Sequence, residues 1–278
     1  MGGIIWLASY PKSGNTWVRA FLHNLFRDPK SPFDINKMDA LTGNEAALPN
    51  FTAADGRPWQ EWTPDDVAAM RPAVQKRLSD RQQHMTFCKT HMSVLQVRGH
   101  PTINMSVTAG AVYIVRNPLD IVSSLADHQG LTTAKAIEMM NLTNYETPTT
   151  QTMAGEPWGS WSQNVESWTG HANSALHVMG YEDMLADPLK VFSGLVGFLR
   201  LDATPERIER AVENASFNVL RALEERDGFR ERTMAQRRFF RSGKSGSWRD
   251  ELTDDEARTV VAAHRQQMER FNYVPDGF

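Results

Sequence analysis

The chain has 278 residues, of which 41% are hydrophobic, and its formal net charge is −3. This weak negative charge argues against a protein that coats nucleic acid or anionic membrane, although it permits a local basic pocket for an anionic ligand. A single cysteine, Cys88, excludes an intrachain disulfide and a thiolate metal cluster. Because the sequence also lacks a signal-peptide pattern and an apolar run of about 18 residues, we expect a cytoplasmic protein.

The first predicted elements are a strand, a tight turn and a helix. Residues 4–8 form a continuous apolar run that ends in Ser9-Tyr10-Pro11-Lys12-Ser13-Gly14, which is typical of a buried parallel strand. Apolar side chains then recur at helical spacing from Asn15 to Phe26. Further strands are predicted over 85–88, 111–115 and 175–179, and further helices over 64–78, 119–126, 134–141, 161–168, 189–199, 205–214 and 253–271. This alternation predicts an α/β fold with a mostly parallel sheet flanked by helices.

We expect one domain over residues 1–278, with irregular covering segments at about 28–63 and 128–159. Both segments are polar and interrupted by proline and glycine, apart from the helix over 134–141. Their apolar side chains could line a pocket for a small molecule or could simply pack within a cover, and the sequence leaves both open. These side chains are Phe33, Phe51, Trp59, Trp62, Met139, Met140 and Trp158.

Polar side chains gather where the predicted strands end. Lys12, Lys89-Thr90-His91, Arg116 and Tyr181 all follow a strand, and ligands of open parallel sheets bind at the carboxyl ends of the strands. The turn at Lys12 places a lysine, a glycine and small donors at the entry to a helix, which favours an anion. The turn lacks the first glycine of a Walker A loop and the lysine that follows the second, so nucleoside triphosphate hydrolysis is disfavoured.

Four segments resemble, in order, the motifs of cytosolic-type sulfotransferases. Residues 9–17 are similar to the family's 5′-phosphosulfate loop, and Lys89-Thr90-His91 to its catalytic segment. Residues 113–118 with Ser124 are similar to its 3′-phosphate segment, and residues 240–248 to its carboxyl-terminal motif. Tyr181-Glu182-Asp183-Met184 matches a further block, and the opening residues look most like bacterial members that sulfate glycopeptide antibiotics.

The resemblance implies the P-loop-NTPase-like sulfotransferase fold, 3′-phosphoadenosine 5′-phosphosulfate (PAPS) as donor and PAP as product, with no metal. Sulfuryl transfer to a small-molecule hydroxyl would then proceed in line through a loose transition state, so positioning and charge stabilisation dominate catalysis. His91 would be the general base, while Lys12 and Lys89 would stabilise oxygens of the leaving and transferring groups. The implied nucleotide ligands are Lys12, Ser13, Gly14, Asn15 and Thr16 at the 5′ end, Arg116, Ser124, Arg241, Ser242 and Gly243 at the 3′-phosphate, and Trp17, Tyr181 and Phe217 around adenine.

Some residues depart from the family pattern, and others could have a purely structural role. Ser242 stands where the family usually has lysine, which removes one charge from the 3′-phosphate site unless Lys244 substitutes. The family's dimer motif is altered around Thr253 and Arg258, so a homodimer stays open but not through that motif. Ser124 could be a surface serine, Phe217 a core residue and Arg241 part of a solvated basic face.

Two other functions compete with sulfuryl transfer. A small-molecule kinase with an atypical phosphate loop would bind ATP with Mg²⁺, and a non-catalytic nucleotide-binding protein would be indifferent to loss of His91. The sequence does not decide between a phenol, an alcohol and a larger natural product as the acceptor.

Overall fold

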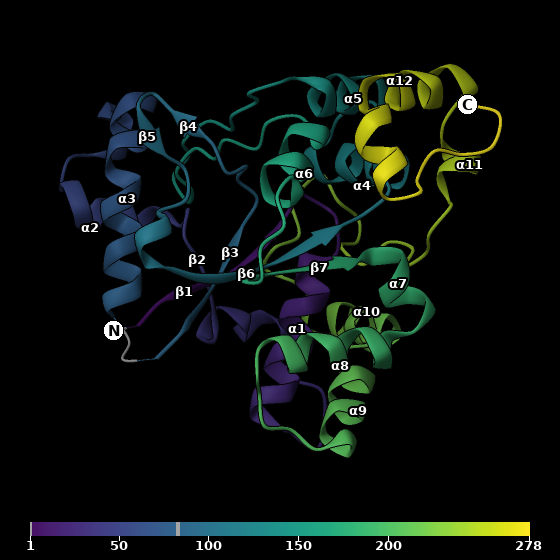
Figure 1. Ribbon diagram of the computed structural model, residues 1–278, viewed down its shortest axis with the longest axis horizontal. Coiled ribbons are helices and arrows are strands. Elements are labelled where there is room, and N and C mark those ends of the chain that lie inside the picture. Colours follow the sequence, from purple (N-terminus) through teal and green to yellow (C-terminus); the bar gives the residue numbers. More distant parts are fainter. Residues whose placement is uncertain (1, 82–83) are drawn as a thin grey trace. The chain divides into compact units, whose positions relative to one another are not determined.

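The computed structural model describes residues 2–81 and 84–278 (Figure 1). The chain divides into two compact units, and it passes between them several times. Unit 1 consists of Met1–Tyr10, Thr42–Tyr113 and Met139–Val178, and unit 2 of Pro11–Leu41, Ile114–Glu138 and Met179–Phe278. The predicted motifs are therefore distributed over both units.

A five-stranded sheet carries the strands that the apolar runs predict. Strand β3 (Thr86–Thr90) pairs in parallel with β1 (Ile4–Ser9) and with β2 (Thr42–Asn44). The order of the sheet is β2-β3-β1-β6-β7, where β6 is Thr108–Val115 and β7 is Leu176–Gly180. Side chains of β1 and β6 are almost entirely buried, as expected for parallel strands covered on both faces. The predicted α/β class with a parallel sheet is confirmed.

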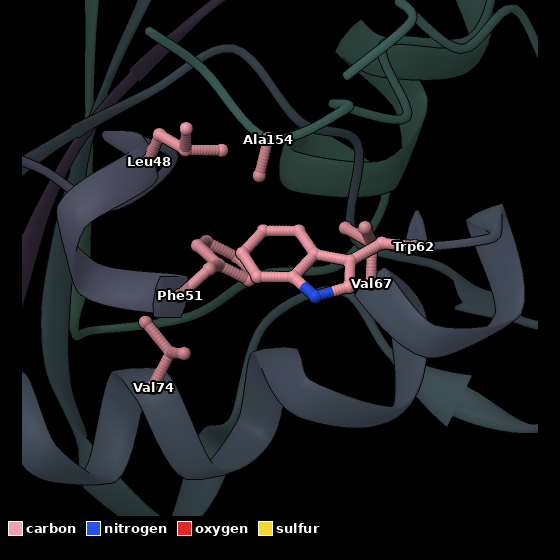
Figure 2. Packing of buried hydrophobic residues seen from close by; sticks show 6 residues of the cluster. All are labelled: Leu48, Phe51, Trp62, Val67, Val74 and Ala154. Carbon is pink, nitrogen blue, oxygen red and sulfur yellow. The ribbon is translucent and has the colours of Figure 1, made fainter. Parts of the chain in front are cut away.

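The helices of unit 1 pack around a small apolar cluster. Helix α3 (Pro64–Asp80) begins where predicted, because Thr63 and Asp66 exchange the two hydrogen bonds of a capping box. It packs against α2 (Leu48–Asp55). The cluster that joins them is drawn in Figure 2 and consists of Leu48, Phe51, Trp62, Val67, Val74 and Ala154. Phe51 and Trp62 are thus core residues of unit 1. Of the two roles considered for them, lining a pocket or packing within the cover, the structure shows packing.

The segment 28–63 is more regular than predicted. It contains η1 (Ile35–Ala40), β2, α2 and η2 (Trp59–Glu61). Each of these elements is eight residues or shorter, so none spans enough turns or alternations for its period to stand out against the surrounding proline and glycine. In the segment 128–159, α5 (Thr133–Asn141) matches the predicted helix, and isolated bridges join Ala47 with Met153 and Glu146 with Pro157.

Unit 2 is mainly helical (Figure 1). Helix α1 (Asn15–Arg27) packs against α9 (Pro205–Asn214), which also contacts α8 (Pro188–Phe198) and α10 (Phe217–Asp227). Helix α4 (Pro118–Gln129) contacts both α11 (Trp248–Glu251) and α12 (Asp254–Arg270). The short α7 (Tyr181–Ala186) follows β7 directly and contacts α8. The remaining elements of the described chain are α6 (Trp161–Thr169), η3 (Met105–Val107), and the antiparallel pair β4 (Gln96–Val97) and β5 (His100–Pro101).

Candidate functional site

The turn between β1 and α1 has a backbone that few residues adopt. The φ angle is 67° at Lys12 and 103° at Gly14, and both values lie in the left-handed region. A Cβ atom on Gly14 would lie 2.7 Å from Cδ2 of Tyr181, so any larger residue collides with α7. At Lys12 the same region costs of order 1–3 kcal/mol, and such strain concentrates at functional sites.

The amino terminus of α1 offers donors to an anion. Within the described chain no side chain caps this terminus, and its first turn contains no acidic residue. The positive end of the helix dipole and outward-facing N–H groups favour a negative ligand there. Ser13 is 1% exposed, and its Oγ has no hydrogen-bond partner among the described residues. A phosphate oxygen is the kind of group that would satisfy this hydroxyl. Asn15 and Thr16, the other predicted ligands of this end, form the first turn of α1.

The side chain of Lys12 faces an aromatic ring of the carboxyl-terminal segment. Its Nζ lies 4.0 Å from the centre of the Phe239 ring. A cation over a ring face is attracted by the negative charge density of that face. Phe239, which the motif comparison did not single out, therefore helps to orient the lysine within unit 2.

Arg116 links the turn at Lys12 to the carboxyl-terminal loop at Lys244. Its Nη1 donates to the Lys12 carbonyl at 3.0 Å, and its Nη2 donates to the Lys244 carbonyl at 3.3 Å. The guanidinium lies 4.2 Å from the ring centre of Tyr181. The residue is 7% exposed, and its Nε has no partner in the part of the chain that the structure describes. One side chain thus holds two segments that are 232 residues apart in sequence, at Lys12 and at Lys244.

Two carboxylates hold the backbone next to Arg116. Glu182 accepts from the Asn117 amide at 3.0 Å and from the Tyr273 hydroxyl at 2.7 Å. Asp120 accepts from the amides of Gly246 at 2.7 Å and Trp248 at 3.0 Å. Burial raises the pKa of Glu182, and the hydrogen bonds from Tyr273 and Asn117 act in the opposite direction.

The predicted adenine-binding aromatics lie among the same segments of unit 2. Trp17 meets Tyr181 edge to face, with ring centres 6.0 Å apart. Phe217 lies against the backbone of Gly243, because a Cβ atom there would be 2.4 Å from its ring. Gly243 has a φ of 62°, which also favours glycine. Phe217 is therefore next to the carboxyl-terminal loop.

Among the predicted ligands of the 3′-phosphate, Arg241 forms an ion pair, whereas Ser124 and Ser242 are half-buried serines. Arg241 donates from both Nη atoms to the two carboxylate oxygens of Glu251, at 2.8 and 2.9 Å. Ser124 is half-buried on α4, and Ser242 is half-buried beside Arg241 in the chain. The carboxylate opposite Arg241 was not predicted from the sequence.

His91 lies in unit 1 at the end of β3. The strand register aligns Thr90 with Ala8, which brings His91 beside Ser9 at the end of β1. The His91 Nδ1 lies 2.8 Å from the Ser9 carbonyl oxygen. Because a carbonyl only accepts, this contact selects the tautomer with the proton on Nδ1 and the lone pair on Nε2. Lys89 lies on β3 two residues before His91, which directly follows the end of that strand.

Buried groups from α6 and the preceding loop support His91. Asn164 is fully buried, and its Nδ2 donates to the carbonyl oxygens of His91 and Trp158, each at 2.9 Å. Its Oδ1 accepts from the Tyr113 hydroxyl at 2.8 Å. The Trp158 ring meets the His91 ring edge to face, with centres 6.2 Å apart. A buried asparagine in an apolar helix face is the signal that could have marked Asn164 in advance.

Comparison with known proteins decides the family. A model of the sulfotransferase domain matches residues 4–272. The chain belongs to the sulfotransferase domain family. This sulfotransferase is 23% identical to Sulfotransferase 1E1 of Mus musculus over 94% of its length and 82% of the relative's. It is also 23% identical to Flavonol 3-sulfotransferase of Flaveria bidentis, over 90% and 77%. A mouse sulfotransferase solved in complex with PAP superposes with a TM-score of 0.62 at 20% identity, covering 97% of this chain and 85% of that one.

Family membership confirms the predicted family and fold and makes the chain an enzyme of sulfuryl transfer. The resemblance to bacterial members stays a prediction. In the described residues, no helix combines the length and apolar character needed to cross a bilayer. Over the same residues, no group of three His, Cys, Asp or Glu side chains is arranged to hold a metal ion.

Proposed function

We propose that this sulfotransferase moves the sulfuryl group of PAPS to a hydroxyl of a small molecule, with His91 as general base. The observation that carries the proposal is the pair of hydrogen bonds from Arg116 to the Lys12 and Lys244 carbonyls. These bonds join the two loops that the donor's phosphates would need within unit 2. A loop strained at Lys12, an uncapped helix and a buried Ser13 hydroxyl then suit the 5′-phosphosulfate.

The residues of unit 2 also fit the rest of the donor. Ser13, Gly14, Asn15 and Thr16 would hold the 5′-phosphate, while Trp17, Tyr181 and Phe217 would enclose adenine. Arg116 through Nε, Ser124, Arg241, Ser242 and Gly243 would hold the 3′-phosphate. Bound there, PAPS supplies an activated sulfuryl group with a nucleotide as leaving group. Lys12 would stabilise negative charge on the leaving oxygen, and Lys89 would stabilise the oxygens in transfer.

His91 is suited to accept the acceptor's proton. With Nδ1–H directed to the Ser9 carbonyl, Nε2 takes the proton, and the carbonyl then stabilises the imidazolium. Ser9 precedes Lys12 by three residues, so the covalent chain keeps their Cα atoms within about 11 Å. We propose on this ground that residues 1–278 form one sulfotransferase domain.

Relatives support both the donor and the general kind of acceptor. Structures of retinol dehydratase, with TM-scores of 0.63 and 0.61 and identities of 18% and 17%, are described as complexes with PAP and with retinol or androsterone. Both small molecules carry an alcohol on an apolar body. We propose an acceptor of similar character, without a choice between alcohol and phenol.

Calorimetry and an acceptor screen test the proposal. Adenosine 3′,5′-bisphosphate should bind without metal, whereas ATP with Mg²⁺ should bind far more weakly. With labelled donor, a correct acceptor should gain about 80 Da, the mass of SO₃. Tighter binding of ATP with Mg²⁺ than of the bisphosphate would instead support a kinase.

The His91→Ala variant tests the general base. Turnover should fall by about 10²-fold or more, because general base catalysis contributes about 10²–10⁴-fold. The dissociation constant of the bisphosphate should change by less than about threefold, since the base faces the acceptor. His171→Ala, at an exposed histidine of unit 1, is the matched control and should keep full turnover. Full turnover in His91→Ala would eliminate the base assignment.

A further inference from the structure

Arg241 forms an ion pair with Glu251 of the same chain, and the two side chains are 35% and 27% exposed. Its Nη1 donates to Oε1 of Glu251 at 2.8 Å, and its Nη2 donates to Oε2 at 2.9 Å. Parallel two-point pairing is the geometry with which a guanidinium also binds phosphate. Glu251 therefore uses the donor groups of Arg241 that a phosphate would use.

The surroundings of Glu251 are those of an anion site. Burial by itself would raise the pKa of Glu251, but hydrogen bonds from Arg241 and Ser123 and the charges of Arg241 and Arg116 lower it below its ordinary value. Ser123 is the chain neighbour of Ser124. The carboxylate thus lies among the groups assigned above to the 3′-phosphate, and it carries its full negative charge near neutral pH.

Arg116 has few hydrogen-bond donors left for a phosphate beside Glu251, although its charge still acts on that carboxylate. Both Nη atoms of Arg116 already donate to backbone carbonyls. Position 242 is serine, where the family pattern has lysine. A 3′-phosphate would have to displace Glu251 from Arg241 and would then lie close to a second negative group.

We infer that Glu251 is a specificity-determining residue, which competes with the 3′-phosphate of the donor for Arg241 and so weakens discrimination against nucleotides that lack this phosphate. The inference rests on the proposed function, because it takes the 3′-phosphate to bind at Arg241. Glu251 should then weaken the binding of the 3′-phosphate only. The 5′-phosphate, which we place at α1, should not respond to this residue.

Titration calorimetry of the full chain with two nucleotides tests the inference. Glu251→Gln keeps the size of the side chain but removes the charge. The variant should bind adenosine 3′,5′-bisphosphate about fivefold more tightly than the wild type, while adenosine 5′-monophosphate should change by less than about twofold. Adding Arg241→Ala to Glu251→Gln should abolish the gain, since the competing partner is then absent.

A matched control separates this local effect from net charge. Glu269→Gln makes the same change in α12. There Oε1 of Glu269 lies 3.5 Å from Nη1 of Arg265, so this glutamate also has an arginine partner. This variant should leave both dissociation constants unchanged. An equal gain in both variants, an equal gain for both nucleotides, or no gain in Glu251→Gln would overturn the inference while bisphosphate binding still supports the proposed function. Failure of the wild type to bind the bisphosphate would overturn both.

Discussion

Backbone carbonyl groups orient the Arg116 and His91 side chains of this sulfotransferase. The Lys12 and Lys244 carbonyls accept from Arg116, and the Ser9 carbonyl contacts Nδ1 of His91. A carbonyl cannot ionise, so it holds a cation or selects a tautomer without a change of charge. The backbone must then adopt a defined conformation around these carbonyls. In the turn at Lys12 this conformation includes positive φ angles at Lys12 and at Gly14.

The variant Gly14→Ala tests how tightly this turn is packed. Its Cβ would lie 2.7 Å from the Tyr181 ring, in addition to the cost of a φ of 103°. We expect unfolding free energy to fall by about 2–4 kcal/mol, as overpacking and backbone strain combine. Bisphosphate affinity should fall as well. Urea denaturation and calorimetry are the measurements.

Gly56→Ala provides the control for backbone strain alone. Gly56 has a φ of 82°, and a Cβ there meets nothing within 4 Å. It should cost about 1 kcal/mol and leave nucleotide affinity unchanged. Equal losses in the two variants would show that contact with Tyr181 contributes nothing.

At the scale of elements, Asp120 ties α4 to the start of α11. Its carboxylate is 2% exposed and accepts from the amides of Gly246 and Trp248, with a longer contact of 3.4 Å to the Ser247 hydroxyl. Backbone amides at the amino terminus of α11, a helix of only four residues, thus find their acceptor on a side chain of α4. This tie positions the loop that carries Gly243 against Phe217.

Asp120→Ala should release this loop. With two amides left without their acceptor, we expect a loss of about 1–3 kcal/mol in unfolding free energy. Hydrogen exchange of the Gly246 and Trp248 amides should accelerate by at least tenfold, as followed by mass spectrometry. Asp120→Asn keeps one oxygen acceptor and should show a smaller effect. Unchanged exchange in Asp120→Ala would contradict the assignment of Asp120 as the tie.

At the scale of the molecule, two buried histidines link stability to pH. Burial lowers the pKa of His264 to about 4, and burial together with the charges of Arg19 and Arg27 lowers that of His23 to about 4, although a hydrogen bond to Met38 opposes the shift. In the unfolded chain both should titrate near 6.5. The folded state therefore binds fewer protons between these values, so stability is complete above about pH 6.5 and is lost as the pH falls towards 4.

The variant His264→Gln tests this dependence. Near pH 5, each such histidine should contribute a slope of about 1.4 kcal/mol per pH unit to the unfolding free energy. The variant should lower the total slope by about that amount, whatever its stability at pH 7. Urea denaturation at intervals from pH 7 to pH 4.5 measures the slope. An unchanged slope would show that His264 does not remain neutral in the folded protein.

The sequence determined the α/β class, the strands β1, β3, β6 and β7, and the turn at Lys12 that leads into a helix. Long apolar runs, capping boxes at Thr63 and Thr253, and motifs of several adjacent residues are local patterns that hold whatever packs on them. The short β2 and η1 escaped detection, since three to six residues carry too little periodicity.

Tertiary structure alone decided which side chains act on one another. Three hydrogen-bonded pairs illustrate this point. They are Glu251 with Arg241, Asp120 with Gly246 and Asn164 with His91, which lie 10, 126 and 73 residues apart in sequence. No pattern in the sequence joins such partners, because each pairing arises only when separate elements pack together. The packing likewise made Phe51 and Trp62 core residues, by closing α2 and α3 over them.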